Sequence, residues 1–357
     1  MMKRMMSILL MLMLVFSLTA CSGGSEPAAS TNEGGGDAPA KTRVAIVFSG
    51  NLGDKSYNDS CYAGALKAQD EFDIELKTLE GTEAAEWEAN FLAVAEEGYD
   101  LIICSSSNFE EYMKEHCANY PDTKFAIIDT TVEGDNIVSV SFAQNQGSFL
   151  AGAAAAMFTK MSDIEGVNDE NIIGWVGGMD IPVLHDFYTG YEQGAKYVDP
   201  DITILQSFAG TWNDPLKGKE LTLAQYQQGA DVVMNVASGT GTGILEAATE
   251  AGKYAIGVDL NQDGDQPGHV LTSMLKRVDS ACYLLIKSVV DGTFEGGSKQ
   301  YLTIADNGVS LTDMSVMKEA LGDQFPDEIL TKIQELQDKI VSGEIVVENY
   351  EGFGPNN

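Results

Sequence analysis

The sequence predicts an α/β protein with two lobes, each built on a mostly parallel β-sheet that carries helices on both faces. Two observations lead to this prediction. Short apolar segments of strand length alternate with longer amphipathic segments, which is typical of successive β-α-β units. The same alternation begins again near residue 148, and residues 42–357 exceed the length of one typical domain.

The first β-α-β block occupies the segment before residue 145. Val44–Phe48 and Leu101–Cys104 are apolar at every position, as expected for strands that a parallel sheet buries on both faces. The segments between such strands have the mixed composition of amphipathic helices. We expect strands at residues 42–49, 74–78, 101–104, 125–129 and 137–141, and helices at residues 57–72, 82–97 and 108–119.

The second block opens with an alanine-rich segment, residues 148–161, which has the composition of a helix. We expect further strands at residues 172–177, 202–208, 232–237, 254–258 and 270–275, and helices at residues 183–197, 216–228, 243–251 and 279–291. A helix at 326–342 and a last strand at 343–349 end the chain. Two such blocks in succession predict two similar lobes with several crossings between them.

The first 20 residues have the pattern of a secretory signal peptide. Lys3 and Arg4 form a basic start, and the apolar run Ile8–Phe16 is shorter than the about 20 residues of a membrane span. Small residues then lead to Cys21, as in bacterial lipoprotein signals; an ordinary signal peptide with a chance cysteine is the alternative. We therefore expect a signal peptide at 1–20, lipidation of Cys21, a flexible tether at 21–41, and a lipid-anchored protein on the extracytoplasmic face of the cell membrane.

The chain is strongly acidic, with a formal net charge of −33. Loss of Lys3 and Arg4 with the signal makes the mature chain −35, because no acidic residue precedes Cys21. Nucleic acids and anionic lipid surfaces are bound through basic patches, so this charge argues against both as direct partners. It favours a neutral or cationic ligand over a polyphosphate.

No pattern in the sequence predicts catalysis, a metal site or a cofactor. A P-loop, an H-E-x-x-H motif and a G-x-S-x-G motif are all absent. The three histidines, His116, His185 and His269, form no recognisable triad or two-metal cluster. A nucleoside hydrolase, the enzymatic alternative, would need an acid cluster or a general base in its cleft. We therefore expect a binding protein and not an enzyme.

Four cysteines follow Cys21, and none of them lies in a C-x-x-C pair or has the spacing of a zinc site. Cysteine in such positions behaves as a small buried apolar residue. The spacing assigns no disulfide among Cys61, Cys104, Cys117 and Cys282.

Two loops each place an aromatic side chain where a pocket lip is expected. Trp212 follows a predicted strand and precedes a helix, and Tyr57 has the equivalent place in the first block. Ligands of open α/β sheets bind at such loops, outside the carboxyl ends of the strands. We predict that the two rings close on a flat ligand; the alternative is that each ring packs within its own lobe.

Three other predicted strands are followed by residues that can contact a ligand through a backbone or a charged side chain. Gly239 and Gly241 open a helix, where glycines either let a ligand approach the backbone or simply form a turn. Asp259 comes directly after a buried strand and can cap a helix or accept two hydroxyl donors, such as those of a ribose. Lys276 lies just before a predicted helix, where the helix dipole disfavours a cation, and this conflict favours a ligand-binding role over a surface lysine.

Several separated segments together resemble one known family, the basic membrane protein family of substrate-binding lipoproteins, typified by a purine nucleoside receptor. The resemblance covers essentially all of residues 42–352. The segments that carry it are Gly53–Asn58, Lys124–Asp129, Gln146–Gly152, Gly177–Pro182, Asn213–Lys219, Ile256–Asp259 and Thr272–Asp279.

The resemblance implies a type I periplasmic-binding-protein fold, with two Rossmann-like lobes, a hinge crossed several times and a ligand cleft. It implies an N-terminal lobe of residues 42–145 and about 276–305, and a C-terminal lobe of residues 146–275 and about 306–350. Members of the family capture nucleosides and deliver them to the permease of an ABC importer. The resemblance therefore implies the same role for this chain.

In the family an aromatic side chain from each lobe sandwiches the base, and this role falls to Tyr57 and Trp212. The other ligand-binding residues that we expect are Ser56 or Asn58, Asp259 and Lys276 as polar contacts, Gly239 and Gly241 on the ribose side, and Met179, Asp180 and Ser105 from neighbouring loops.

Two positions depart from the family pattern. Purine nucleoside binders often carry an acid at the end of the first strand, where this chain has Phe48, and we expect an apolar wall there in place of an acceptor for base N–H groups. The loop Ser105–Phe109 lacks the usual glycine-rich form, and a nearby family acid aligns with Glu111. A purine nucleoside is the first expectation. The alternatives are another flat aromatic solute, such as a flavin, and a sensor receptor that presents its ligand to a signalling partner.

Overall fold

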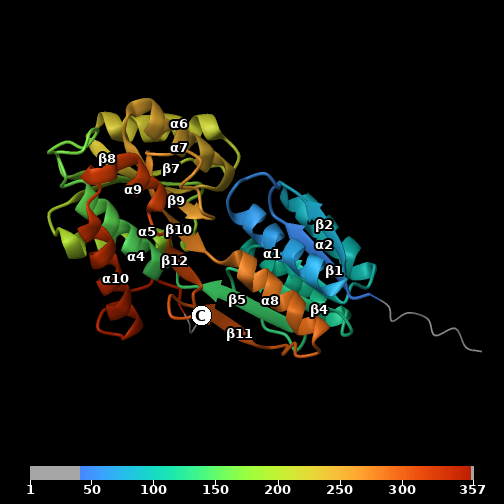
Figure 1. Ribbon diagram of the computed structural model, residues 1–357. Helices are drawn as coiled ribbons and strands as arrows, with labels where there is room; N and C mark the ends of the chain where they lie inside the picture. The colour runs from blue at the N-terminus through green and yellow to red at the C-terminus, as the bar shows by residue number, and fades with distance from the viewer. Residues whose placement is uncertain (1–40, 355–357) are drawn as a thin grey trace, which may run out of the picture. The chain divides into compact units, whose positions relative to one another are not determined.

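Two six-stranded sheets organise the residues that the computed structural model describes, 41–354 (Figure 1). Each sheet has helices on both faces, which confirms the predicted α/β fold with two lobes. The predicted signal peptide, most of the predicted tether and the predicted lipidation site Cys21 lie outside the described residues. Within residues 41–354, no helix combines the length and the apolar character needed to cross a bilayer.

The N-terminal sheet is entirely parallel, with the order β11-β5-β4-β3-β1-β2. Its strands are β1 (Arg43–Phe48), β2 (Glu75–Glu80), β3 (Leu101–Cys104), β4 (Lys124–Ile128), β5 (Ile137–Phe142) and β11 (Lys299–Leu302). Its helices are α1 (Tyr57–Phe72), α2 (Ala84–Glu96), α3 (Glu110–His116) and α8 (Val278–Val290).

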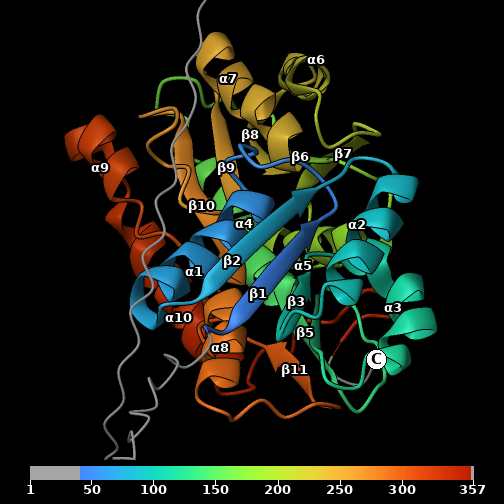
Figure 2. The ribbon, with the colours of Figure 1, turned by 90° about the vertical axis from the view of Figure 1, so that its right-hand side faces the viewer.

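Alternation along β1 divides the N-terminal lobe into two hydrophobic layers. Val44 and Ile46 point to the face that contains Cys61 and Ala65 of α1. Ala45 and its alternate neighbours point to the opposite face, which α2 covers. Figure 2 shows α1 and α2 on the two sides of β1 and β2. Helix α8 lies against α1 although more than 200 residues of chain separate them, so the late segment completes the first lobe (Figure 1).

The C-terminal sheet has the order β12-β10-β9-β8-β6-β7, and only its edge strand β12 is antiparallel. Its strands are β6 (Ile172–Gly177), β7 (Thr203–Phe208), β8 (Ala230–Val236), β9 (Tyr254–Asp259), β10 (Val270–Lys276) and β12 (Val309–Leu311). Its helices are α4 (Gln144–Phe158), α5 (Pro182–Val198), α6 (Pro215–Gln227), α7 (Gly241–Ala251), α9 (Ser315–Leu321) and α10 (Asp327–Val341).

Helices α4 and α5 cover one face of this sheet at backbone contact. A Cβ on Gly152 of α4 would lie 2.0 Å from the carbonyl oxygen of Tyr191, so only glycine allows the two helices to approach this closely. Helices α6 and α7 cover the other face, where Tyr226 and Ile244 pack on the alternate residues of β8. The parallel strands therefore all end at the side from which the loops to α5, α6 and α7 emerge.

The chain passes between the two lobes three times in the described part: from β5 to α4, from β10 to α8, and from β11 to β12. Three connections form the hinge that the fold class requires. Lys276 is the last residue of β10, and thus lies where the second crossing begins.

The structure corrects three expectations about the elements. Helix α4 begins at Gln144, four residues earlier than predicted, because the Gln144 amide donates to Asp186 at 2.6 Å and holds the extra turn. The predicted strand at 343–349 is wrong. Its backbone is held by side chains instead, among them the Asn145 amide, which donates to the carbonyl oxygen of Val347 at 2.9 Å. The prediction also missed β11, β12 and α9.

Candidate functional site

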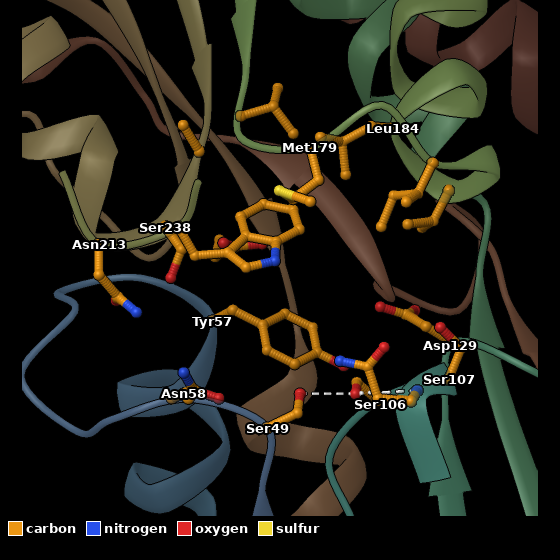
Figure 3. Close-up of a pocket in the computed structure, with 18 of the residues that line it drawn as sticks. Ser49, Tyr57, Asn58, Ser106, Ser107, Asp129, Met179, Leu184, Asn213 and Ser238 are labelled. Atoms are coloured by element: carbon orange, nitrogen blue, oxygen red, sulfur yellow. Dashed lines mark hydrogen bonds between the residues drawn. The ribbon is translucent and has the colours of Figure 1, made fainter. Parts of the chain in front are cut away.

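A cavity of about 320 Å³ lies between the lobes, at the carboxyl ends of strands from both sheets (Figure 3). The residues that line it come from the loops after β1, β2, β3 and β4 and the starts of α1 and α2 in the first lobe, and from the ends of β6, β7 and β8 and the start of α5 in the second. Asp259 and Lys276, the last residues of β9 and β10, complete the wall. This is the place where open α/β sheets bind their ligands.

Four aromatic side chains line the cavity, and two of them, Tyr57 and Trp212, are the pair that the sequence predicted on opposite lobes. Tyr57, the first residue of α1, is held by its hydroxyl, which donates to the carbonyl oxygen of Ser105 at 2.5 Å. Burial raises the pKa of Tyr57 above its ordinary value of 10.0, so this hydroxyl keeps its proton. Trp212 lies in the loop from β7 to α6, and its indole packs on Gly178, where a Cβ would be 2.3 Å from the ring. Both rings are therefore held in place by their surroundings.

An ion pair forms part of the cavity wall. The Lys276 ammonium lies 2.6 Å from Oδ2 of Asp129, which directly follows β4 of the first lobe. The Lys276 side chain is buried and that of Asp129 is largely so, with exposed fractions of 2% and 10%. The ammonium also lies 5.3 Å from the ring centre of Tyr57, within the range of a cation–π contact.

The second carboxylate oxygen of Asp129, Oδ1, is buried and has no hydrogen-bond partner within the described structure. A buried carboxylate oxygen without a donor costs free energy, so the site favours a ligand that supplies one. Figure 3 shows Asp129 directed toward the cavity from the side opposite Asn213 and Ser238.

Asp259 links the two lobes. Its Oδ2 accepts a hydrogen bond from the Ser56 hydroxyl, which belongs to the loop between β1 and α1. Burial raises the pKa of Asp259 to about 6, although the nearby Lys276 ammonium and the Ser56 hydroxyl act in the opposite direction. Ionisation of the Asp259 carboxyl group therefore costs free energy in this site. Such perturbed pKa values are common among residues that act on a ligand.

The same loop makes further contacts with the second lobe. The Ser238 hydroxyl donates to Oδ2 of Asp54 at 2.7 Å, and the Gln262 amide donates to the carbonyl oxygen of Lys55 at 3.0 Å. Asp54 is itself buried. Its carboxylate accepts hydrogen bonds from the backbone N–H groups of Ser56, Asn58 and Asp59 around the start of α1. These contacts hold the lobes together over the cavity, which corresponds to a closed arrangement.

The first lobe also contributes a wall of neutral polar groups. The hydroxyls of Ser49 and Ser106 share a hydrogen bond of 2.6 Å at the cavity. The other polar or aromatic side chains of this wall are Asn58, Thr82, Trp87, Ser107 and Asn108.

The structure brings six of the eleven expected ligand-binding residues to the cavity: Tyr57, Asn58, Met179, Trp212, Asp259 and Lys276. Ser56 and Ser105 lie directly behind it, because each hydrogen-bonds to a lining residue.

Three expected residues do not line this cavity. Asp180 is exposed and pairs with His185 at 2.6 Å. Gly239 lies next to Ser238, which lines the cavity in its place. Gly241 opens α7 against Asn235, whose amide oxygen would be 2.3 Å from a Cβ at this position, so the absence of a side chain serves packing there.

The expectation that Phe48 forms an apolar wall of the site is wrong. Its side chain is fully buried in the core of the first lobe, because β1 points it away from the cavity toward the face covered by α1 and α8. The next residue along the chain, Ser49, lines the cavity instead.

Sequence reasoning missed Asp129, Trp87, Ser49 and the Ser106–Asn108 loop as cavity residues. Asp129 had a signal, since it follows a buried strand as Asp259 does. Both residues adopt positive φ angles, 67° and 65°, at the carboxyl ends of β4 and β9. Trp87 carried no local signal, because it lies on α2 and reaches the cavity only through the packing of that helix.

Two α/β lobes, three connecting segments and a polar-aromatic cavity between the lobes define a two-lobed solute-binding protein. The family described as Bmp, ABC transporter substrate-binding protein PnrA-like, matches residues 41–351, and the chain belongs to this family. The predicted family is thereby confirmed.

Relatives of similar length support the assignment. An ABC transporter nucleoside-binding protein, BmpA, from Lactococcus lactis is 31% identical over 317 residues, which cover 82% of this chain and 88% of the relative. An uncharacterised lipoprotein from Pyrococcus abyssi is 32% identical over 375 residues, covering 94% and 89% of the two chains. Among solved structures, a solute-binding protein of an ABC transporter system from Aeropyrum pernix K1 is 29% identical with a TM-score of 0.80, covering 87% of this chain and 94% of that chain.

Proposed function

We propose that this protein is a lipid-anchored extracytoplasmic receptor that binds a nucleoside and delivers it to an ABC importer. The observation that carries the proposal is the cavity between the lobes, lined by aromatic rings from both lobes, Tyr57 and Trp212 among them, and by carboxylates and a buried ammonium. A flat base and a polyhydroxylated sugar need these two kinds of surface.

The base is assigned to the space between Tyr57 and Trp212. Stacking on an aromatic side chain contributes about 1–3 kcal/mol per base, and it tolerates different bases because every base has a π-face. The neutral hydroxyl and amide groups of the first-lobe wall, such as Asn108, supply donors and acceptors for the edge of the base. A purine is the first candidate.

The sugar is assigned to the charged side of the cavity. The free Oδ1 of Asp129 and the carboxylate of Asp259 accept hydrogen bonds from hydroxyl groups, and the Lys276 ammonium donates to hydroxyl or ring oxygens. Bonds of this kind to charged groups contribute more than neutral ones, typically about 1.5–3 kcal/mol. A free base would leave these groups without partners and should bind more weakly than its nucleoside.

The names of the relatives support the ligand class and the location. The Lactococcus lactis relative is named a nucleoside-binding protein, and the Pyrococcus abyssi relative is named a lipoprotein. The leader with Cys21 at its cleavage point agrees with a lipid anchor. A tether at residues 21–41 would leave the lobes free to reach a permease.

Closure of the lobes would commit the ligand. The contacts of Ser56 with Asp259 and of Ser238 with Asp54 join the lobes at the cavity. A ligand that touches both lobes has more contacts in the closed form, and it therefore shifts the equilibrium toward that form. The permease would then receive the closed, loaded receptor.

Calorimetric titration of the purified protein with purine nucleosides, pyrimidine nucleosides, free bases and riboflavin tests the proposal. We expect saturable heat from at least one nucleoside and weaker binding of its base. Trp212→Ala should weaken the binding about 5- to 150-fold, the equivalent of the stacking free energy. Trp212→Phe keeps a ring and should lose less, and Tyr197→Ala removes a half-exposed aromatic side chain of α5 and should change nothing.

If no nucleoside gives binding heat, the nucleoside assignment is refuted. If riboflavin alone binds, the ligand is a flavin. Unchanged affinity in Trp212→Ala would remove the sandwich. Import is tested in cells: a strain that produces the Trp212→Ala variant should take up labelled nucleoside more slowly than the wild type at limiting concentrations.

A further inference from the structure

Two buried cysteines meet in the core of the first lobe. Cys61 lies on α1 and Cys282 lies on α8, and their Sγ atoms are 2.9 Å apart. Both side chains are fully buried. Disulfide bonds have an S–S distance of about 2.05 Å, so a movement of less than 1 Å brings these atoms to bonding distance.

The packing of the two helices explains why the thiols approach each other. A Cβ on Gly64, one turn after Cys61, would lie 2.0 Å from the carbonyl oxygen of Asp279, one turn before Cys282. The backbone N–H of Asp279 donates to the Ser60 hydroxyl at 3.2 Å. The close approach of the two backbones one turn away from each cysteine is what allows two short side chains to meet across the helix interface.

We propose that Cys61 and Cys282 form an intramolecular disulfide that joins α1 to α8. This inference goes beyond nucleoside binding, and it rests on the extracytoplasmic location in the proposed function, since disulfides persist in such compartments. The two thiols lose two protons and two electrons and gain one S–S bond. A disulfide oxidant, low-molecular-weight or that of a thiol–disulfide oxidoreductase, accepts the electrons and becomes two thiols.

The bond forms during folding, because the folded lobe buries both sulfur atoms. The hydrogen bond with the Cys61 thiol, together with burial, raises the pKa of Cys282 above its ordinary value of 9.0, which leaves little thiolate for exchange in the native state. Once formed, the bond is shielded from reductants by the same core. It is a structural bond rather than an exposed redox switch.

The other two cysteines provide an internal comparison. Cys104 at the end of β3 and Cys117 after α3 lie in the hydrophobic cluster on the opposite face of the first sheet. Both are buried, and all four cysteines that the structure describes are free thiols in it. The sheet separates this cluster from Cys61 and Cys282, so exchange between the two pairs would require unfolding of the lobe.

The proposed bond joins parts of the chain that are 221 residues apart. A cross-link that closes so long a loop restricts the unfolded chain strongly. It also connects the two segments that position the cavity groups, because α1 begins with Tyr57 and α8 directly follows the strand that ends at Lys276.

Thiol counting on the full-length lipoprotein tests the inference. The protein is extracted from membranes in detergent at low pH, which suppresses thiol exchange, and it is then alkylated in denaturant with and without prior reduction. We expect two alkyl groups, on Cys104 and Cys117, before reduction and four after it, because the sulfur of the lipidated Cys21 is a thioether that the reagent does not alkylate. A tryptic map should contain a linked peptide pair with Cys61 and Cys282 that disappears on reduction.

Several cysteine variants are compared, so that the thiol counts still give an answer if one substitution impairs folding. Cys61→Ser should raise the count before reduction to three, because Cys282 becomes free, and Cys104→Ser should lower it to one. Reduction should lower the Tm of the wild type and of Cys104→Ser, and it should leave the Tm of the Cys61→Ser/Cys282→Ser double variant unchanged.

Four alkyl groups on the unreduced wild type, or a linked peptide with any other pair, would overturn the inference. Refolding the reduced protein with oxidised glutathione gives a second answer: the Cys61–Cys282 link should form, and mixed disulfides on all four thiols would contradict it. None of these measurements depends on a ligand, so nucleoside binding and the disulfide can fail separately.

Discussion

Replacement of Asp259 by asparagine should make the protein more stable at neutral pH while it weakens ligand binding. Asp259 is buried at the junction of the lobes, where Ser56 and the Lys276 ammonium are its neighbours. Asparagine has nearly the same shape and its amide oxygen still accepts a hydrogen bond from Ser56. The variant therefore removes the charge and keeps the packing.

The magnitude follows from the pKa of this group. Burial raises the pKa of Asp259 from 3.8 to about 6, a difference that corresponds to about 3 kcal/mol. Because the folded protein holds this proton more tightly than the unfolded chain, ionisation of Asp259 disfavours folding above pH 6. The penalty declines as the pH falls from 6 and disappears below 3.8. Asp259→Asn should thus gain up to about 3 kcal/mol in free energy of unfolding at pH 7.5 and little at pH 4.

Urea unfolding of the ligand-free wild type and variant at both pH values measures this difference. Asp306→Asn serves as a control of opposite sign, because hydrogen bonds from Thr303 lower the pKa of Asp306, so this variant should lose stability at pH 7.5 and lose less as the pH falls. An Asp259→Asn variant that is no more stable than the wild type at pH 7.5, or whose gain is the same at pH 4, would refute the reasoning.

Three other substitutions probe the remaining parts of the site. Lys276→Met leaves the buried Asp129 without its cation and should cost about 3–5 kcal/mol in free energy of unfolding, measured with urea; a change below 1 kcal/mol would contradict a buried ion pair. Gly178→Ala places a Cβ 2.3 Å from the Trp212 ring, so it should displace the indole and weaken nucleoside binding in calorimetry about as much as loss of the ring, with Tm nearly unchanged. Ser238→Ala removes one hydrogen bond between the lobes and should weaken binding about 5-fold, equivalent to about 1 kcal/mol, and an unchanged Kd would show that this bond does not support closure.

Most of the fold could be predicted from local pattern, because buried parallel strands are apolar throughout. Leu101–Cys104 and Ile172–Gly177 were predicted with the bounds that the structure has. The edge strands β11 and β12 were missed, since β11 is largely exposed, contains Lys299 and Gln300, and forms only by pairing with β5. Such strands depend on a partner far away in the chain, which a local pattern does not report.

The candidate site was predictable where a loop carries an unusual residue and not where tertiary packing decides. Tyr57 and Trp212 stood out as aromatics at the carboxyl ends of strands. Phe48 shows the opposite case. The alternation of side chains along β1 decides which face of the sheet a residue occupies, and alignment with a family pattern does not reveal that Phe48 points into the core. Trp87 reaches the cavity from a helix whose place only the folded lobe determines.

The position of Lys276 at the start of a lobe crossing bears on how the receptor meets its ligand. Points near an axis of rotation move little when a body turns, whereas points at the rim move far. Lys276 ends the strand from which one crossing begins and Asp129 is paired with it, whereas the Asp54–Ser238 bond joins two loops that contain no crossing segment. Opening should therefore part the outer loops first and leave the ammonium–carboxylate pair assembled. A solute that enters the open form would then meet the Lys276–Asp129 pair already formed, and closure would only have to bring the aromatic rings of the two lobes together on it.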